Sequence, residues 1–259
     1  MTHRYVFVCG LHRSGTSLVT RMIAGLPGVA GIEGAPVPEN EGVYLQGAIP
    51  HTARDGVPMH FATDPAQHHV EGSAYDRLET KRRIEADWAP WFAEAPWRVE
   101  KSPVNLTRMR LYQQLFPMAQ FVVVTRHPEA VAGAVRKWRD MPFGAMIDHW
   151  IAAHRVVADD LPFLHAALVV RYEDLVADPT QVQRRLAAFL DIAPGPLGEA
   201  VRDGNADYRP GGEVSAAQAE AMAEWGYGPG MAVHEARLQV SHPLWRVAHA
   251  VKVATPPEG

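Results

Sequence analysis

The chain has 259 residues, of which 47% are hydrophobic and 21% are charged, and its formal net charge is −4. This length suits one large α/β domain better than two small ones. Because the net charge is slightly negative, no overall positive field draws the chain to nucleic acid or to a membrane surface. A single cysteine, Cys9, excludes an internal disulfide and fits a reducing compartment.

The first ten residues contain a basic pair followed by a short apolar run. That run is far too short for a signal peptide or a membrane-spanning helix. We therefore expect a cytoplasmic protein.

Short apolar runs alternate with stretches of helical spacing along the chain. The runs expected to form buried strands are residues 5–9, 98–101, 121–125 and 167–170. The stretches expected to form helices are residues 17–26, 106–115, 131–138 and 179–190. Pro128 suits the start of the third helix, and Asp178 suits the N-cap of the fourth. Strands separated by helices predict an α/β fold, a parallel β-sheet flanked by helices with right-handed crossovers.

Two long segments interrupt this alternation. Residues 28–72 and residues 194–259 are rich in glycine and proline and show little periodicity. Long irregular insertions on a rigid sheet are where binding sites and lids usually lie. We expect one domain over residues 1–259, with a core of about residues 5–190 and with these two segments shaping the substrate site or a lid.

A glycine-bearing loop lies directly between the first expected strand and the first expected helix. Residues 10–17 read Gly-Leu-His-Arg-Ser-Gly-Thr-Ser, and such a turn at a helix N-terminus is a ready anion site. Arg13 can add a bidentate contact to phosphate oxygens. The spacing matches a P-loop, except that Thr16 stands where that motif has lysine. Because nucleoside-triphosphate enzymes use that lysine together with Mg²⁺, its absence favours a donor that carries less charge on the transferred group.

The Arg-Ser-Gly-Thr-Ser sequence of residues 13–17 resembles the 5′-phosphosulfate loop of the sulfotransferases that use 3′-phosphoadenosine 5′-phosphosulfate (PAPS). It is more similar to the bacterial and tyrosylprotein-type branch than to the cytosolic steroid and phenol enzymes, which have lysine where this chain has Arg13. The resemblance spans about residues 5–190 and implies a P-loop-like fold, PAPS as co-substrate, and transfer of a sulfuryl group to a hydroxyl by in-line displacement without a metal. The loop residues that it assigns to PAPS are Arg13, Ser14, Gly15, Thr16 and Ser17.

Arg126 follows the strand expected at residues 121–125, at the edge where ligands of open α/β sheets bind. This segment is similar to the family's 3′-phosphate motif, in which a serine follows the arginine by eight residues. Here that position is Ala134, and Arg136 or Lys137 could supply the missing contact. Residues 209–212, late in the chain, could close on the same phosphate.

Tyr172 opens a Tyr-Glu-Asp sequence after the fourth expected strand. The sequence resembles the family segment whose tyrosine lies at the adenine. The alternative is a tyrosine that simply belongs to the core.

Sulfuryl transfer needs a base for the acceptor's proton and a cation for the departing oxygen. Lys101 resembles the family lysine that stabilises the leaving group. Cytosolic animal enzymes place a histidine base two residues later, where this chain has Pro103. The tyrosylprotein branch instead takes a glutamate soon after the first helix. In this chain the equal candidates for that glutamate are Glu41 and Glu33, followed by Glu39 and His51.

Two other groups of residues could have a functional role. The spacing of His60, His68 and His69 fits no standard metal site, and we expect no metal. The aromatic residues of a helix-like stretch after Leu78 could form core or line an apolar acceptor pocket, and core is the preferred interpretation. They are Trp88, Trp91, Phe92 and Trp97.

Two other functions stay open. The first is a P-loop nucleotide kinase or phosphotransferase, which the missing lysine disfavours. The second is a nucleotide-binding regulator without chemistry, which Ala134 allows. The expected partner is a small-molecule or peptide hydroxyl acceptor, and the sequence leaves its identity and the oligomeric state open.

Overall fold

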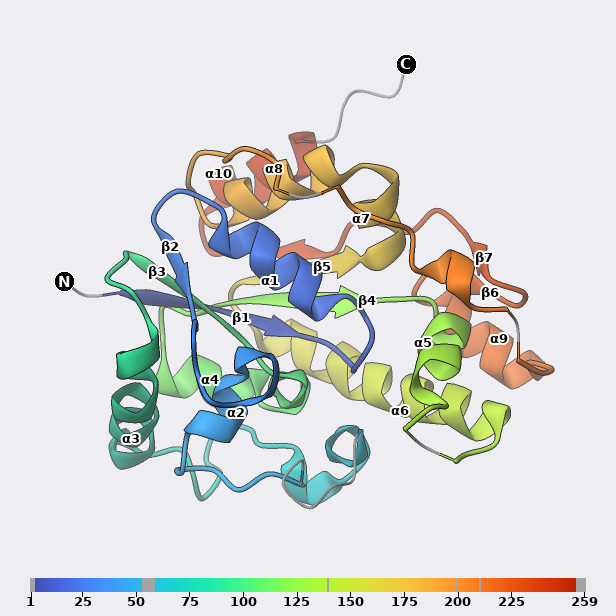
Figure 1. Cartoon of the computed structure of the whole chain (residues 1–259), viewed down its shortest axis with the longest axis horizontal. Coiled ribbons are helices and arrows are strands. Elements are labelled where there is room, and N and C mark those ends of the chain that lie inside the picture. Colours follow the sequence, from blue (N-terminus) through green and yellow to red (C-terminus); the bar gives the residue numbers. More distant parts are fainter. Residues whose placement is uncertain (1–2, 53–58, 139, 199, 210, 255–259) are drawn as a thin grey trace.

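A computed structural model describes residues 3–52, 59–138, 140–198, 200–209 and 211–254. Its centre is a six-stranded sheet in the order β2-β3-β1-β4-β5-β8 (Figure 1). The first five of these strands in sheet order pair in parallel, whereas β8 pairs antiparallel with β5. The fold is therefore α/β with a mixed, mostly parallel sheet, which confirms the predicted class and corrects the expectation that every strand is parallel. The strands of this sheet are β1 (Arg4–Cys9), β2 (Val29–Gly31), β3 (Trp97–Lys101), β4 (Gln120–Thr125), β5 (Ala167–Arg171) and β8 (Val240–Ser241).

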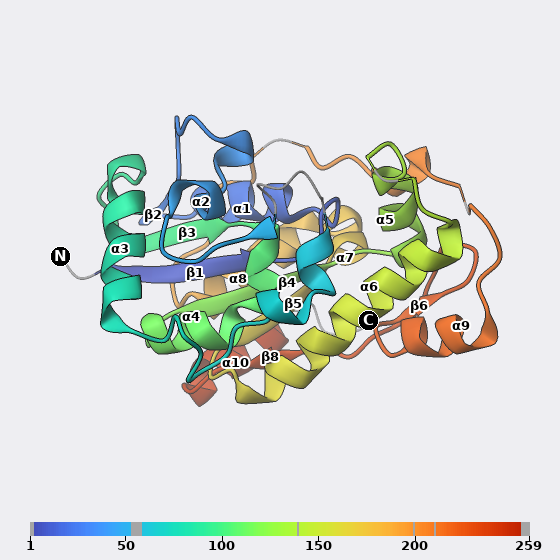
Figure 2. The same ribbon diagram turned by 90° about the horizontal axis from the view of Figure 1, so that it is seen from below.

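Helices cover both faces of the sheet (Figures 1 and 2). On one face lie α1 (Thr16–Ala24), α8 (Pro179–Phe189) and α10 (Trp245–Val253). On the other lie α3 (Leu78–Trp88), α4 (Met109–Leu115) and α6 (Phe143–Asp160). The remaining helices are the short α2 (Gly42–Leu45), α5 (Pro128–Val135), α7 (Tyr172–Ala177) and α9 (Ala216–Ala223).

The pleat of the central strands divides the core into two layers. Val6 and Val8 of β1 pack with the cluster beneath α1 and α8, whereas Phe7 and Cys9 pack with the cluster on the other face. Side chains alternate between the two faces of a strand, so a strand covered on both faces must be apolar throughout. The continuous apolar runs in the sequence are thus explained by burial on both sides.

The predicted elements are confirmed with small shifts at their ends. The expected strands became β1, β3, β4 and β5, and the expected helices became α1, α4, α5 and α8. Pro128 is the first residue of α5, and the Asp178 carboxylate accepts a hydrogen bond from the backbone N–H of Gln181 at 2.9 Å, as a cap should.

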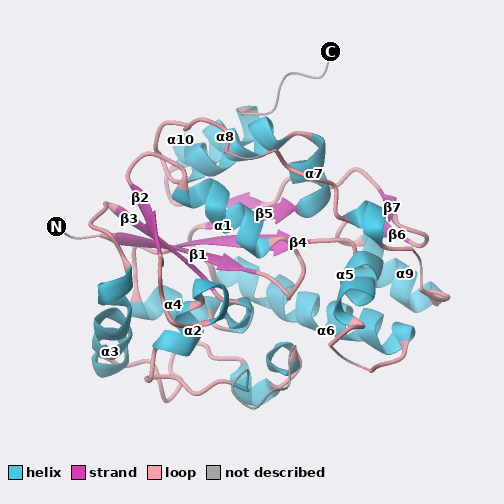
Figure 3. Cartoon of the chain, in the orientation of Figure 1, coloured by secondary structure: helices cyan, strands magenta, loops and turns pink. Residues whose placement is uncertain are grey.

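The prediction that residues 194–259 are irregular is wrong for much of that segment. It contains α9, α10, β8 and a small hairpin of β6 (Tyr227–Gly228) and β7 (Ala232–Val233) (Figure 3). The segment 28–72 is closer to expectation, because its described part holds only β2, α2 and short 3-10 turns; residues 53–58 lie outside the description.

The aromatic group at the end of α3 and just beyond it belongs mainly to the core, as preferred from the sequence. Trp88 and Phe92 are buried in the cluster on the α3 face, and the partly exposed Trp91 packs against it. Trp97 is buried in the cluster on the opposite face. Among the residues described here, no helix is long and apolar enough to cross a membrane.

Candidate active site

The loop between β1 and α1 is shaped by two residues with left-handed backbone conformations. Gly15 has φ +95° and Arg13 has φ +68°, and Gly15 is the N-cap of α1 without any side chain capping that helix. The first turn of a helix has free N–H groups and a positive dipole end, so anions bind there. Ser14 is fully buried, and its hydroxyl oxygen has no hydrogen-bond partner in the structure. The loop therefore has the donors of an anion cradle.

The other loop side chains differ in their surroundings. Arg13 is exposed, and its guanidinium lies 5.6 Å from the centre of the Trp138 ring. Thr16 is buried at the start of α1, whereas the Ser17 hydroxyl donates a 3.2 Å hydrogen bond to Glu39. Ser17 stands at the hydroxyl position of the P-loop pattern, whereas Thr16 occupies the position where that pattern has lysine.

Arg126 contacts the loop from the end of β4. Its Nη1 donates to the backbone oxygen of Arg13 at 2.8 Å, and its Nε donates to Asn205 Oδ1 at 2.7 Å. The remaining nitrogen, Nη2, is buried without a hydrogen-bond partner. Burial lowers the pKa of Arg126, so the charged guanidinium has lost solvation that an anion would replace.

Tyr172 links the loop to the C-terminal part of the chain. A Cβ placed on Gly15 would lie 2.7 Å from the Tyr172 ring, so the ring packs directly on that glycine. The Tyr172 hydroxyl donates to the backbone oxygen of Arg202 at 3.1 Å and accepts from Gly204 N at 2.8 Å. The Arg126 guanidinium lies 4.3 Å from the centre of the same ring. Tyr172 is thus buried between the loop, Arg126 and residues 202–204.

Lys101 and Glu41 form a buried ion pair. Lys101 is the last residue of β3, and its Nζ donates to Glu41 Oε1 at 2.9 Å. Lys101 is 5% exposed and Glu41 is 7% exposed. Burial raises the pKa of Glu41, and the positive charge of Lys101 opposes that rise. A carboxylate and an ammonium of this kind provide a proton acceptor and a positive charge in one place.

These groups meet at one edge of the sheet because β1 lies between β3 and β4. The loop after β1, Lys101 at the end of β3 and Arg126 after β4 therefore follow the carboxyl ends of three adjacent parallel strands. This is the position at which open α/β sheets bind ligands. Residues 5–194 match the model of the sulfotransferase family, which is more than half of the chain. This chain belongs to the sulfotransferase family.

Solved structures of other sulfotransferases share the fold. The sulfotransferase domain from the Synechococcus PCC 7002 olefin synthase matches with a TM-score of 0.50 and 20% identity, covering 97% of this chain and 95% of that chain. Sulfotransferase STF9 from Mycobacterium avium matches with a TM-score of 0.53 and 14% identity, covering 80% of this chain and 67% of that chain. No curated protein matches the sequence. At these identities the likeness concerns the fold.

The other candidate bases of this sulfotransferase have different surroundings. Glu33 is exposed and lines, with Ser17, Glu39 and Lys101, a cavity of about 300 Å³. Glu39 receives the hydrogen bond of Ser17. His51 is buried, and its ring packs edge-on against Tyr44 at 5.3 Å. Of the two glutamates left equal by the sequence, Glu41 is the one in contact with Lys101.

The residues expected around the second phosphate differ in their burial and contacts. Ala134 is buried on α5, whereas Arg136 and Lys137 are exposed. In residues 209–212, Gly211 and Gly212 lie against the Phe143 ring, and Pro210 lies outside the described residues.

The sequence interpretation missed two residues beside Arg126. They are Asn205, which accepts its Nε–H, and Tyr208, whose ring centre lies 5.5 Å from the guanidinium. Both belong to a loop whose sequence has no periodic signal, so only the fold reveals them.

The three histidines considered for a metal have separate surroundings. His68 Nε2 contacts Asp160 at 2.9 Å, the His69 ring packs edge-on against Tyr75, and His60 lies 3.6 Å from Asp64. Within the described parts of the chain, no group of three or more His, Cys, Asp or Glu side chains could hold a metal ion.

Proposed function

We propose that this sulfotransferase transfers a sulfuryl group from PAPS to the hydroxyl of an acceptor by in-line displacement. The observation that supports this most directly is Arg126 Nη2, a buried guanidinium nitrogen without a partner beside the β1–α1 loop. A buried unpaired donor is costly, and a phosphate oxygen would satisfy it. PAPS carries phosphate groups at its 5′ and 3′ positions. The β1–α1 loop would hold the first, and Arg126, which adjoins that loop, would hold the second.

The residues that would hold PAPS come from four segments. The Ser14 hydroxyl, the first turn of α1 and Arg13 would bind the phosphosulfate. Arg126 would bind the 3′-phosphate, and the Tyr172 ring beside it would contact the nucleoside. When bound, PAPS supplies the sulfuryl group and a nucleotide leaving group.

Glu41 and Lys101 would carry out the proton transfer and the charge stabilisation. A new S–O bond forms to the acceptor oxygen while the S–O bond to the 5′-phosphate breaks, and the acceptor proton passes to Glu41. We choose Glu41 over Glu33 because Glu41 contacts Lys101 at 2.9 Å, and this positive charge opposes the rise in the Glu41 pKa that burial causes. Lys101 also supplies positive charge where negative charge develops on the departing oxygen.

The direct test compares ligands by isothermal titration calorimetry. We expect 3′,5′-ADP to bind more tightly than 5′-AMP, because only the former offers a 3′-phosphate to Arg126. We expect ATP with Mg²⁺ to bind weakly. Preferred binding of ATP with Mg²⁺ would instead support the phosphotransferase alternative.

A second measurement separates an enzyme from a non-catalytic regulator. Wild-type protein is incubated with ³⁵S-labelled PAPS, and transfer to added alcohols or to water is followed. The proposed activity predicts that transfer of the ³⁵S label to alcohols or to water requires the enzyme and depends on Glu41. Tight 3′,5′-ADP binding with no transfer to any acceptor or to water would favour the regulator. The acceptor is expected to be a small-molecule or peptide hydroxyl.

A further inference from the structure

The backbone next to Glu41 is held by the two residues that flank Lys101. Glu100 Oε1 accepts hydrogen bonds from Gly42 N at 2.9 Å and from the Ser102 hydroxyl at 2.6 Å. The Ser102 oxygen in turn accepts from Val43 N at 3.0 Å. Glu100 is 1% exposed and Ser102 is fully buried. The end of β3 thus fixes the turn that carries Glu41.

Glu100 is itself fixed from the other side. Its second oxygen accepts a 2.6 Å hydrogen bond from Asn105 Nδ2, which also approaches the backbone oxygen of Val8 in β1 at 3.3 Å. These partners of Glu100 are neutral, and burial raises its pKa. A carboxyl group buried in this way is costly unless it is well hydrogen-bonded. Its contacts join β1, β3 and the Glu41 turn.

Gly42 is packed so closely against Glu100 and Trp88 that it leaves no room for a side chain. A Cβ on Gly42 would lie 2.7 Å from Glu100 Oε1 and 2.8 Å from Trp88 Nε1, distances that real Cβ atoms do not tolerate. Trp88 Nε1 also donates to the Gly42 oxygen at 2.9 Å. The turn is therefore held between the end of β3 and α3.

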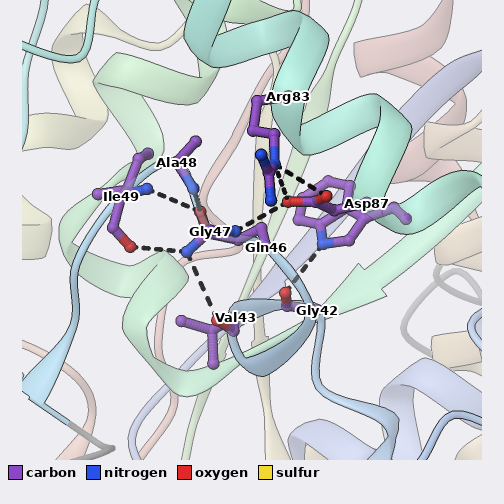
Figure 4. Close-up of polar contacts among 9 residues, drawn as sticks. Gly42, Val43, Gln46, Gly47, Ala48, Ile49, Arg83 and Asp87 are labelled. Atoms are coloured by element: carbon purple, nitrogen blue, oxygen red, sulfur yellow. Dashed lines mark hydrogen bonds and ion pairs between the residues drawn. The ribbon is translucent and has the colours of Figure 1, made fainter.

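The chain just after this turn has its own, separate support. The Gln46 side chain accepts from the backbone of Ala48 and Ile49 at 2.8 Å each, and Asp87 accepts from Gly47 N at 2.9 Å and from Arg83 Nε (Figure 4). None of these hydrogen bonds involves Glu100. Asp87 therefore offers a matched control on the same segment.

We propose that Glu100 is a positioning residue that sets where the Glu41 carboxylate meets Lys101. It acts through the backbone of Gly42 and the Ser102 hydroxyl and does not itself exchange a proton with the acceptor. The inference rests on the proposed roles of Glu41 and Lys101. A small displacement of a catalytic group lowers a rate strongly, so this position matters for turnover more than for donor binding.

The kinetic test compares Glu100→Ala, Glu100→Gln and Asp87→Ala. We expect Glu100→Ala to lower the kcat for sulfate release from labelled PAPS by about tenfold to a hundredfold while the affinity for 3′,5′-ADP stays nearly unchanged. Glu100→Gln should recover much of this loss, because its amide oxygen still accepts from Gly42 and Ser102. Asn105 Oδ1, which is buried without a partner, can turn to accept the new amide N–H. Asp87→Ala should keep kcat near the wild-type value.

A structural readout accompanies the kinetics. Lys101 is buried beneath the Glu41 turn, so its reaction with trace acetic anhydride, measured by mass spectrometry, should be slow in the wild type. Glu100→Ala should speed this labelling several-fold, and Glu100→Gln should not. If Glu100→Ala does not fold, Gly42→Ala displaces the same turn by steric contact and should show the same low kcat and faster labelling.

The outcomes separate positioning from chemistry. A Glu100→Gln variant as inactive as Glu100→Ala would show that Glu100 has a chemical role and would overturn the proposal. Wild-type kcat with a still-protected Lys101 in Glu100→Ala would also overturn it. If the wild type neither binds 3′,5′-ADP nor releases sulfate, the proposed function fails, and the labelling of Lys101 still decides whether Glu100 fixes the turn.

Discussion

Replacing Lys101 by methionine should affect stability and turnover in separable ways. Methionine keeps most of the side-chain length but leaves the buried Glu41 carboxylate without its 2.9 Å partner. Removing one member of a buried ion pair destabilises a protein by about 3–5 kcal/mol. Removing a charge that stabilises the transition state lowers kcat by about 10²- to 10³-fold. We therefore expect both losses in Lys101→Met, with 3′,5′-ADP affinity nearly unchanged.

The loss of stability should depend on pH. Burial raises the pKa of Glu41, and without Lys101 that rise is no longer opposed. A carboxyl group with a raised folded-state pKa is best tolerated when protonated, so the variant should lose stability as pH rises from the unfolded-state pKa through the folded-state pKa. Urea unfolding of Lys101→Met and wild type at pH 5 and pH 8 should show the larger difference at pH 8.

The double variant Lys101→Met/Glu41→Gln then separates the two effects. With the unpaired carboxylate removed, the free energy of unfolding should return close to the wild-type value, while turnover stays low because both proposed catalytic groups are gone. Lys101→Met with wild-type stability would contradict the buried pair. Lys101→Met with wild-type turnover, or a double variant that regains turnover, would refute the proposed mechanism.

Three further predictions concern donor binding and pH. Arg13→Ala should weaken 3′,5′-ADP binding about tenfold to a hundredfold, equivalent to about 1.5–3 kcal/mol, with the fold intact by circular dichroism; unchanged affinity in calorimetry would remove Arg13 from the site. Ala134→Ser should tighten binding of 3′,5′-ADP relative to 5′-AMP, or at least not weaken it. A loss of affinity for 3′,5′-ADP but not for 5′-AMP would show that α5 does not face the 3′-phosphate. Burial lowers the pKa of His154 to about 3, below its unfolded value of 6.5, so the stability that the neutral ring contributes is present above pH 6.5 and is lost as pH falls. This loss of stability reaches about 2 kcal/mol at pH 5. Urea unfolding at pH 7 and pH 5 should show that His154→Phe removes much of this pH dependence. An undiminished pH dependence in that variant would contradict this role for His154.

The central strands were predictable because both of their faces are buried. A strand that must be apolar at every position gives a continuous run, and the runs at residues 5–9 and 121–125 became β1 and β4. The glycine loop was interpretable because its position between such a strand and a helix predicts an anion site. Both features are local in the sequence.

Two kinds of element escaped the prediction for different reasons. The longest helix, α6, was omitted although Met146, Ile147, Trp150, Ile151 and Val157 have clear helical spacing and are buried. By contrast, β8 has two residues, too few for any periodicity, and it forms only because β5 offers an edge in the folded sheet. The first omission could have been avoided from the sequence, and the second could not.

Sequence spacing also could not decide between Glu33 and Glu41. Both follow the first helix, and spacing alone leaves them equal. What separates them is the contact of Glu41 with Lys101, 60 positions away along the chain. That contact is accompanied by the packing of Gly42 between Glu100 and Trp88, which are 58 and 46 positions away. Such contacts depend on β3 and α3 being in place, so only the folded chain distinguishes the two carboxylates.

The geometry around Arg126 suggests that the two halves of the proposed donor site are coupled. Its guanidinium donates to the backbone oxygen of Arg13 on the phosphosulfate side and to Asn205 on the side of the C-terminal loop. Tyr172 joins the same two sides through its packing on Gly15 and its hydrogen bonds to residues 202–204. A movement of the C-terminal loop would therefore shift the contacts of Arg126 and, through them, the backbone of the phosphate loop. This connection accounts for the buried position of Tyr172, for which the sequence resemblance implies a place at the adenine and the alternative is a role in the core.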